Sequence, residues 1–202
     1  MSQKKVGVFG GTFDPIHMGH LILAQNALEE VGLDKVLIMP SGCSYLKDID
    51  KVSPKEHRVE MTRLAIEDND RFELSTIEAE REGNSYTYET FKILCRENPD
   101  TDYYYIIGAD VFMSMKTWNR PEEIFKRCTI VCARRDNIPK KDLDDMLVFL
   151  QKEYDAKVMF MDVPEVRISS TDIKDLIKRG MSCRYYLNEK VIDYIKENGL
   201  YR

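Results

Sequence analysis

The chain has 202 residues, of which 43% are hydrophobic and 32% are charged, with a formal net charge of −5 at pH 7. This length suits one domain, and the composition is typical of a globular protein in water. The negative charge argues against general nucleic-acid binding, which needs a basic surface. We find no signal-peptide stretch and no apolar run long enough to span a bilayer, so we expect no membrane partner.

Cysteine usage indicates a reducing compartment. The five cysteines form an odd set without CxxC spacing: Cys43, Cys95, Cys128, Cys132 and Cys183. Because two of them flank an apolar run, buried thiols fit better than disulfides or zinc ligands. We therefore expect a cytoplasmic protein. No metal-ligand spacing appears, and we predict no metal site made by protein side chains alone.

Short apolar runs recur along the chain and predict strands, with helical patterns between most of them. The predicted strands are 6–9, 36–39, 72–77, 103–107, 129–133 and 158–161. This alternation favours an α/β fold with a Rossmann-like, doubly wound and mostly parallel sheet. In such sheets ligands bind beyond the carboxyl ends of the strands.

A glycine-rich segment joins the first predicted strand to the first predicted helix. It reads Gly10-Gly11-Thr12-Phe13-Asp14-Pro15-Ile16-His17-Met18-Gly19-His20. Unpaired N–H groups at a helix start favour phosphate, glycines let the backbone approach it, and histidines donate to its oxygens. A turn that only reverses the chain is the alternative. Neither the Walker A pattern nor Gly-x-Gly-x-x-Gly is present, so the segment predicts another type of phosphate site.

Two further helix starts follow in the first half of the chain. Ser53-Pro54-Lys55-Glu56 has the spacing of a capping box with proline at the first helical position, which predicts a helix to about residue 68. Ser85 and Thr87 precede a helix predicted over about 88–97, and either hydroxyl is a plausible cap. The N–H groups at that start would also suit a carboxylate.

The centre of the chain offers three candidate ligand contacts. Gly108 and Asp110 follow the predicted strand 103–107, where Asp110 either caps the helix predicted over 109–115 or accepts from a ribose hydroxyl. Trp118, the only tryptophan, sits in a polar loop that suits stacking on a pyridinium ring better than core packing. Arg134 ends another strand, either exposed or paired with phosphate.

Arg167-Ile168-Ser169-Ser170-Thr171-Asp172-Ile173-Lys174 begins the last part of the chain. Its hydroxyls precede apolar residues at helical spacing, so they look like a helix cap. Capping alone would be the default for an isolated Ser-Ser-Thr.

Together, these motifs resemble the HxGH nucleotidyltransferase superfamily, here His17-Met18-Gly19-His20, and its bacterial nicotinate mononucleotide adenylyltransferase branch. The Gly-Gly-Thr-Phe-Asp-Pro lead-in, Ser-Tyr-Thr-Tyr-x-Thr and Ile-Ser-Ser-Thr-x-Ile carry the resemblance from residue 6 almost to the end. It implies a single nucleotidyltransferase domain over 1–202 with a helical part from about 165 to 202. It also implies transfer of AMP from ATP to nicotinate mononucleotide, giving deamido-NAD and pyrophosphate.

The resemblance also assigns roles to residues. It implies that His17, His20 and Lys174 are the catalytic side chains, stabilising charge on the phosphates. The implied ATP contacts are Gly10, Gly11, Thr12, Phe13, His17, His20, Gly108, Asp110, Ile168, Ser169, Ser170 and Lys174. The implied acceptor contacts are Thr87, Tyr88, Trp118, Lys47 and Arg134. Mg²⁺ is expected to arrive on the ATP phosphates.

The chain departs from the family pattern at two places. The loop 40–48 keeps a lysine, Lys47, but lacks the usual Pro-Pro-His. At the second place, Lys174 stands where arginine is usual. Lysine keeps the positive charge but lacks the guanidinium that binds phosphate through two parallel hydrogen bonds. The same chemistry on nicotinamide mononucleotide, phosphopantetheine or a sugar or polyol phosphate stays open, as does a non-catalytic ATP sensor. A nicotinamide-dependent dehydrogenase is disfavoured because its glycine fingerprint is missing. The sequence leaves a homo-oligomer open.

Overall fold

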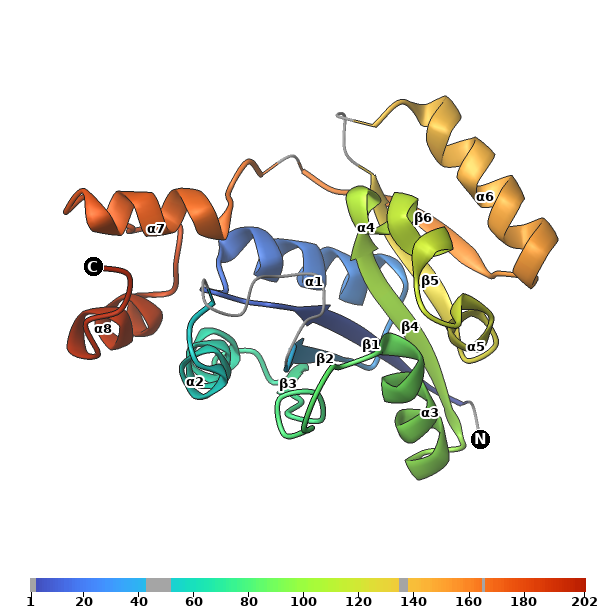
Figure 1. Ribbon diagram of the computed structural model, residues 1–202, viewed down its shortest axis with the longest axis horizontal. Coiled ribbons are helices and arrows are strands. Elements are labelled where there is room, and N and C mark those ends of the chain that lie inside the picture. Colours follow the sequence, from blue (N-terminus) through green and yellow to red (C-terminus); the bar gives the residue numbers. More distant parts are fainter. Residues whose placement is uncertain (1–2, 43–51, 135–137, 165) are drawn as a thin grey trace.

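The computed structural model describes residues 3–42, 52–134, 138–164 and 166–202. Their strands form one six-stranded parallel sheet in the order β3-β2-β1-β4-β5-β6 (Figure 1). The strands are β1 Lys4–Gly11, β2 Lys35–Pro40, β3 Phe72–Leu74, β4 Thr101–Gly108, β5 Cys128–Arg134 and β6 Val158–Asp162. The predicted parallel, Rossmann-like fold class is confirmed.

Helices connect the strands and cover both faces of the sheet. They are α1 Met18–Glu30, α2 Lys55–Ile66, α3 Thr87–Glu97, α4 Ala109–Ser114, α5 Pro121–Phe125, α6 Lys140–Tyr154, α7 Ser170–Lys178 and α8 Glu189–Glu197. A 3₁₀ turn, Met115–Thr117, extends α4. Helices α7 and α8 lie in the range predicted to be helical and away from α6, and α8 lies beside α2 (Figure 1).

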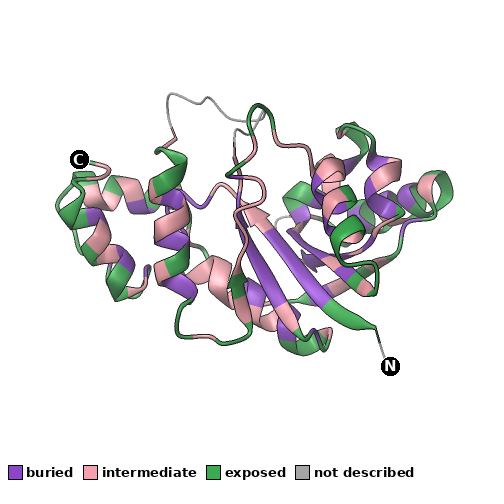
Figure 2. Cartoon of the chain, turned by 90° about the horizontal axis from the view of Figure 1, so that it is seen from below, coloured by how far each residue is buried: buried purple, intermediate pink, exposed green. Residues whose placement is uncertain are grey.

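Side chains that alternate along the strands build two cores. Phe9 of β1 packs with α1, α2, α7 and α8 on one face. Val6 and Val8 of the same strand pack with α3 to α6 on the other face. This period of two, buried on both sides, is the pattern of a covered parallel sheet. The middle strands are accordingly mostly buried, whereas the helices expose their outer faces (Figure 2).

The predicted strand 72–77 is shorter in the structure. Strand β3 ends at Leu74, and Ser75 adds one last hydrogen bond, from its N–H to the carbonyl oxygen of Ile38 (3.0 Å). The partner strand β2 ends at Pro40, which has no N–H to extend a ladder. The chain then leaves the sheet and contributes residues to the cavity described below.

Two predicted helix caps are wrong, and so is the capping alternative for Asp110. Helix α2 has Pro54 at its N-cap, and Ser53 makes no capping hydrogen bond. Tyr86, not Ser85 or Thr87, is the N-cap of α3. Asp110 is the second residue of α4 and Gly108 its N-cap. In each case the N-cap of the structure lies one or two residues from the expected one, which is the range over which helix ends fray.

Candidate active site

A cavity of about 320 Å³ opens at the carboxyl ends of β1, β2 and β4. This is the edge at which parallel α/β sheets bind ligands. It is lined by Val8, Phe9, Gly10, Gly11, Thr12, Met39, Ser41, Glu78, Ser85, Thr87, Thr90, Phe91, Tyr105, Ile106, Ile107, Gly108, Val111 and Trp118. The glycine turn, the α3 start and the Trp118 loop, distant in the sequence, therefore share one site.

The two predicted histidines lie beside this cavity at the start of α1. Their rings stack with centroids 3.6 Å apart, and His20 packs edge-on against Phe13. The backbone N–H of His17 donates to Nδ1 of His20 (3.2 Å). In the neutral ring of His20 the proton is then on Nε2. His17 is buried and His20 half-buried, so both rings are held in defined orientations.

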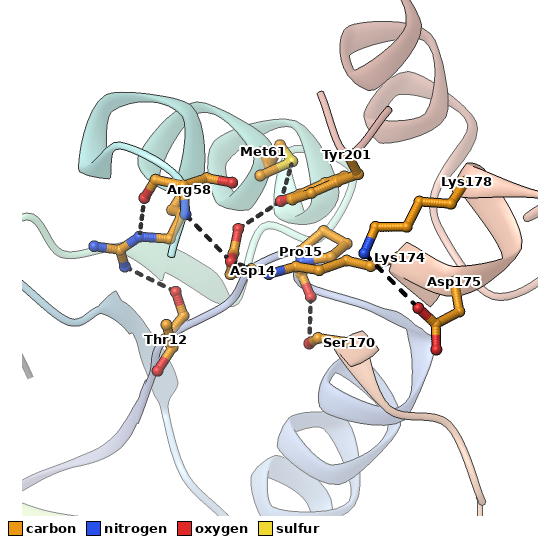
Figure 3. Close-up of polar contacts among 11 residues, drawn as sticks. Thr12, Asp14, Pro15, Arg58, Met61, Ser170, Lys174, Asp175, Lys178 and Tyr201 are labelled. Atoms are coloured by element: carbon orange, nitrogen blue, oxygen red, sulfur yellow. Dashed lines mark hydrogen bonds and ion pairs between the residues drawn. The ribbon is translucent and has the colours of Figure 1, made fainter. Parts of the chain in front are cut away.

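The start of α7 lies against the same turn. Ser169 caps the helix, accepting from the N–H of Asp172 (3.1 Å), as the sequence predicts. The hydroxyl of Ser170 donates to the carbonyl oxygen of Pro15 (3.0 Å), as Figure 3 shows. A Cβ on Gly19 would lie 3.8 Å from the Cβ of Ile168. The histidine segment and the distant serine segment, predicted to converge, are therefore in contact.

Lys174 lies across this junction and binds Asp14, a buried carboxylate in the glycine turn (Figure 3). Burial raises the pKa of Asp14, but hydrogen bonds from Lys174, Tyr201 and Ser53, with the charge of Lys174, outweigh it and lower the pKa below 3.8. Asp14 therefore stays ionised at neutral pH and holds the Lys174 ammonium at the α1–α7 junction.

Arg58, on α2, ties three segments of the rim together. The side chain is 3% exposed. Its guanidinium donates to the carbonyl oxygens of Thr12 (2.8 Å), Ser41 (2.7 Å) and Ser53 (3.1 Å). Arginine can do this because its planar fork carries five donors. The position of the glycine turn therefore depends on this side chain, to which sequence reasoning gave no role.

Trp118 forms one wall of the cavity on the α3 and α4 side. Its indole Nε1 donates to the hydroxyl of Ser114 (3.1 Å), and its ring lies 6.3 Å from that of Tyr105. Thr87, the first residue of α3, lines the same cavity. Tyr88 is half-buried and lies under the guanidinium of Arg120, outside the set that lines the cavity. One edge of the indole is thus anchored.

Glu78 is a carboxylate of the cavity that the sequence analysis missed. Its Oε1 accepts from the hydroxyl of Thr90 (2.8 Å). Burial raises its pKa above the ordinary 4.5, against smaller opposing effects of Thr90 and the charge of Arg81. Glu78 follows the short strand β3, and only the path of the chain after that strand brings it to the cavity.

The remaining predicted residues lie at different places. Asp110 is exposed just beyond the carboxyl end of β4, two residues after Gly108, which lines the cavity. Arg134, at the end of β5, pairs with Asp162 (3.4 Å) and lies over the ring of Phe160, outside the lining set. Lys47 falls outside the described residues.

In the described part of the chain, the cysteines and the potential metal-binding residues do not form a second catalytic or metal site. Cys128, Cys132 and Cys183 are buried, as predicted for structural thiols. Burial raises the pKa of Cys132 to about 12, so this thiol is not a nucleophile at neutral pH. No group of three or more His, Cys, Asp or Glu residues among those described is placed to hold a metal. Within the same residues, no helix is both long and apolar enough to cross a membrane.

The chain resembles characterised families over nearly its whole length. The family model described as cytidylyltransferase-like matches residues 8–176. A relative from Lachnoclostridium phytofermentans, a probable nicotinate-nucleotide adenylyltransferase, is 41% identical and covers 98% of this chain and 100% of its own. A second, with the same description, from Enterococcus faecalis is 40% identical and covers 100% of this chain and 86% of its own.

Solved structures share the fold. The nicotinic acid mononucleotide adenylyltransferase of Plasmodium falciparum complexed with NaAD has a TM-score of 0.79 at 19% identity, covering 98% of this chain and 97% of its own. Its complex with APC gives a TM-score of 0.77 at 18% identity over the same shares. With relatives near 40% identity over full length, the resemblance predicted from the motifs is confirmed: the chain belongs to the nicotinate-nucleotide adenylyltransferase family.

Proposed function

We propose that this chain transfers the adenylyl group of ATP to nicotinate mononucleotide, giving nicotinate adenine dinucleotide and pyrophosphate. One observation carries the site assignment: the starts of α1 and α7 meet at the turn Gly10–Pro15, directly beside the cavity that contains Gly108 and Trp118. Two helix starts and a cation at one point are suited to a triphosphate, and an aromatic wall next to it is suited to a flat acceptor.

In this proposal the reaction is an in-line displacement. An oxygen of the acceptor's 5′-phosphate attacks the α-phosphorus of ATP, and the bond from that phosphorus to the oxygen bridging to the β-phosphorus breaks. Pyrophosphate leaves with that bond's electron pair. His17, His20 and Lys174 stabilise the negative charge on the moving oxygens, with Nε2 of His20 as a donor. The protein contributes position and electrostatics and no covalent intermediate.

The two ligands occupy different parts of the site. Gly10, Gly11, Thr12 and Phe13 approach the ATP phosphates, Ile168, Ser169 and Ser170 close over them, and Asp110 accepts from the ribose beside Gly108. Trp118 stacks on the pyridine ring, while Thr87 and Tyr88 at the start of α3 receive its carboxylate. Ser41, which follows β2, contacts the acceptor, and we propose the same contact for Lys47.

In the same proposal, Mg²⁺ enters the site bound to the phosphates of ATP. Phosphate oxygens and water supply most of its ligands, as Mg²⁺ prefers. The one buried carboxylate in the glycine turn, Asp14, is already bound by Lys174 and Tyr201, so it does not fit the part of a dedicated ligand. We also propose the cytoplasm as the place of action, where ATP is abundant.

An acceptor panel tests the function. Purified enzyme, ATP and Mg²⁺ are combined in turn with nicotinate mononucleotide, nicotinamide mononucleotide, phosphopantetheine and a sugar phosphate, and pyrophosphate release is measured. We expect the highest kcat/KM with nicotinate mononucleotide. A higher value with another acceptor would reassign the substrate, and ATP binding without turnover of any of them would favour a sensor.

A further inference from the structure

The carboxylate of Asp14 is held by groups from three separate parts of the chain (Figure 3). Its Oδ1 accepts from the hydroxyl of Tyr201 (2.6 Å). Its Oδ2 binds the ammonium of Lys174 and accepts from the N–H of Ser53 (3.3 Å). Asp14 is only 4% exposed. A buried carboxylate with both oxygens engaged has a fixed orientation, because any rotation leaves a polar atom without its partner.

The end of α8 places Tyr201 at this point. The N–H of Gly199 bonds to the carbonyl oxygen of Lys196 (3.2 Å), and the N–H of Leu200 bonds to that of Ile195 (3.0 Å). With Gly199 at a positive φ of 61°, this is the Schellman arrangement that reverses a chain at a helix end. The reversal returns Tyr201 towards α2, where its hydroxyl lies 3.9 Å from the sulfur of Met61.

Lys174 is therefore held from two sides. Its Nζ binds Asp14 and lies 5.1 Å from the centre of the Tyr201 ring, within cation–π range. The first turn of the same helix is pinned by the bond from Ser170 to Pro15. Tyr201 thus contacts Lys174 with its ring and orients the partner of Lys174 with its hydroxyl.

We propose that Tyr201 is a positioning residue for the triphosphate: acting through Asp14, its hydroxyl fixes the Lys174 ammonium where the two helix starts meet. This inference rests on the proposed function, which assigns Lys174 to the ATP phosphates. Tyr201 itself touches no substrate in this account. Lysine has a flexible stem and no directional fork, so its placement depends on what surrounds it more than that of an arginine would.

The test separates this role from simple packing. Tyr201→Phe removes the hydroxyl and keeps the ring. Tyr194→Phe is the matched control, because it also removes a hydrogen-bonded hydroxyl, 2.9 Å from Nδ1 of His57, on the neighbouring helix α8. Binding of α,β-methylene-ATP is measured by calorimetry, and the KM values for ATP and for nicotinate mononucleotide are measured by pyrophosphate release.

We expect Tyr201→Phe to weaken analogue binding and raise the KM for ATP by about tenfold, as for loss of a hydrogen bond to a charged group. The KM for nicotinate mononucleotide should change by less than about twofold, since the acceptor lies on the other side of the site. Tyr194→Phe should leave both KM values near those of the wild type. Equal changes in the two KM values of Tyr201→Phe, or loss of its fold, would assign Tyr201 to general stability and overturn the proposal.

A double-mutant cycle gives the second readout. Lys174→Gln removes the charge yet keeps a donor for Asp14, and in that background Tyr201→Phe should have no further effect on analogue binding. Additive losses would show that Tyr201 acts independently of Lys174 and would refute the mechanism. If Lys174→Gln does not fold, the KM comparison decides alone. Binding of the ATP analogue needs no acceptor. If the wild-type protein binds the analogue but turns over no acceptor, the proposed function is refuted, whereas the inference about Tyr201 still stands.

Discussion

The proposed phosphate side and the proposed acceptor side of this site are built in different ways. On the phosphate side, two contiguous segments, 10–20 and 168–174, each contain a helix start, and an ion pair between the half-buried Lys174 and the buried Asp14 joins them. On the acceptor side, single side chains from separate elements meet: Trp118 after a 3₁₀ turn, Thr87 at a helix start, and Glu78 after a short strand.

This difference has a physical reason. Phosphate is bound largely by backbone N–H groups, which need a particular chain path and so a run of consecutive residues. A ring and a ribose are bound by side chains, and any element that reaches the cavity can provide them. We therefore expect changes on the phosphate side to lower turnover or weaken ATP binding, and changes on the acceptor side to weaken acceptor binding.

The largest effect is expected from His20→Ala. Removing a donor aimed at developing phosphate charge should lower kcat by about 10²- to 10³-fold. Unfolding by urea should show a much smaller loss of stability. His57→Ala is the control, since that ring bonds Tyr194 away from the cavity. Unchanged kcat in His20→Ala would remove this residue from the mechanism.

A smaller effect is expected from Asp14→Asn. The half-buried ammonium of Lys174 would lose its counter-charge, at a cost on the order of 2–3 kcal/mol of unfolding free energy. Because the pKa of Asp14 is lowered in the folded state, its stabilisation is complete above pH 3.8 and is lost as pH falls through the folded pKa. Urea unfolding from pH 3 to 7 should show the two proteins converging at the acid end. A constant gap at all pH values would contradict the assignment.

Trp118→Leu tests the acceptor side. Loss of the flat ring should raise the KM for nicotinate mononucleotide by about tenfold, while the KM for ATP stays within about twofold. Phe149→Leu is a suitable control, because Phe149 is an exposed aromatic residue on α6 with a comparable ring contact, to Tyr154. A rise in the KM for ATP alone would indicate that Trp118 contacts the adenosine of ATP and not the pyridine ring.

The smallest effect is expected from Glu78→Gln. Since burial raises the pKa of Glu78, the folded protein loses stability as pH rises from 4.5 through the folded pKa. The amide does not ionise and removes that loss. The unfolding free energy of the variant minus that of the wild type should therefore be larger at pH 7 than at pH 4.5, by up to about 1 kcal/mol. Urea titrations at the two pH values measure it, with the exposed Glu82→Gln as the control. A variant whose stability follows the wild-type pH dependence would contradict this.

Sequence reasoning found what is local. Apolar runs gave all six strands, and the glycine turn, the two histidines and the Ser169 cap lie in contiguous motifs whose chemistry depends on spacing. The contact between segments 10–20 and 168–174 could be predicted only because each segment is recognisable alone. The caps predicted at Ser53 and at Ser85 or Thr87 lie one residue from the N-caps of the structure, Pro54 and Tyr86, because helix ends are defined only to within a residue or two.

What sequence reasoning missed depends on packing. Arg58 shares a helix face with Met61, Thr62 and Ala65, so a cation on an apolar stripe was the available signal that it is buried and bonded. Glu78 and Tyr201 gave no such signal. Tyr201 follows the local reversal at Gly199, but its bond to Asp14 spans 187 residues, and Glu78 reaches the cavity from the irregular segment after β3.

The place of β1 in the middle of the sheet affects how the protein is made. Lys4 on β1 pairs with Thr101 on β4, whereas its other neighbour, β2, begins at Lys35. A growing chain that has not yet been synthesised as far as residue 108 lacks the wall of the cavity that β4 supplies. The proposed ATP site also takes residues 168–174, which bond to Asp14 and Pro15, so ATP can stabilise the folded state only when most of the polypeptide has been synthesised.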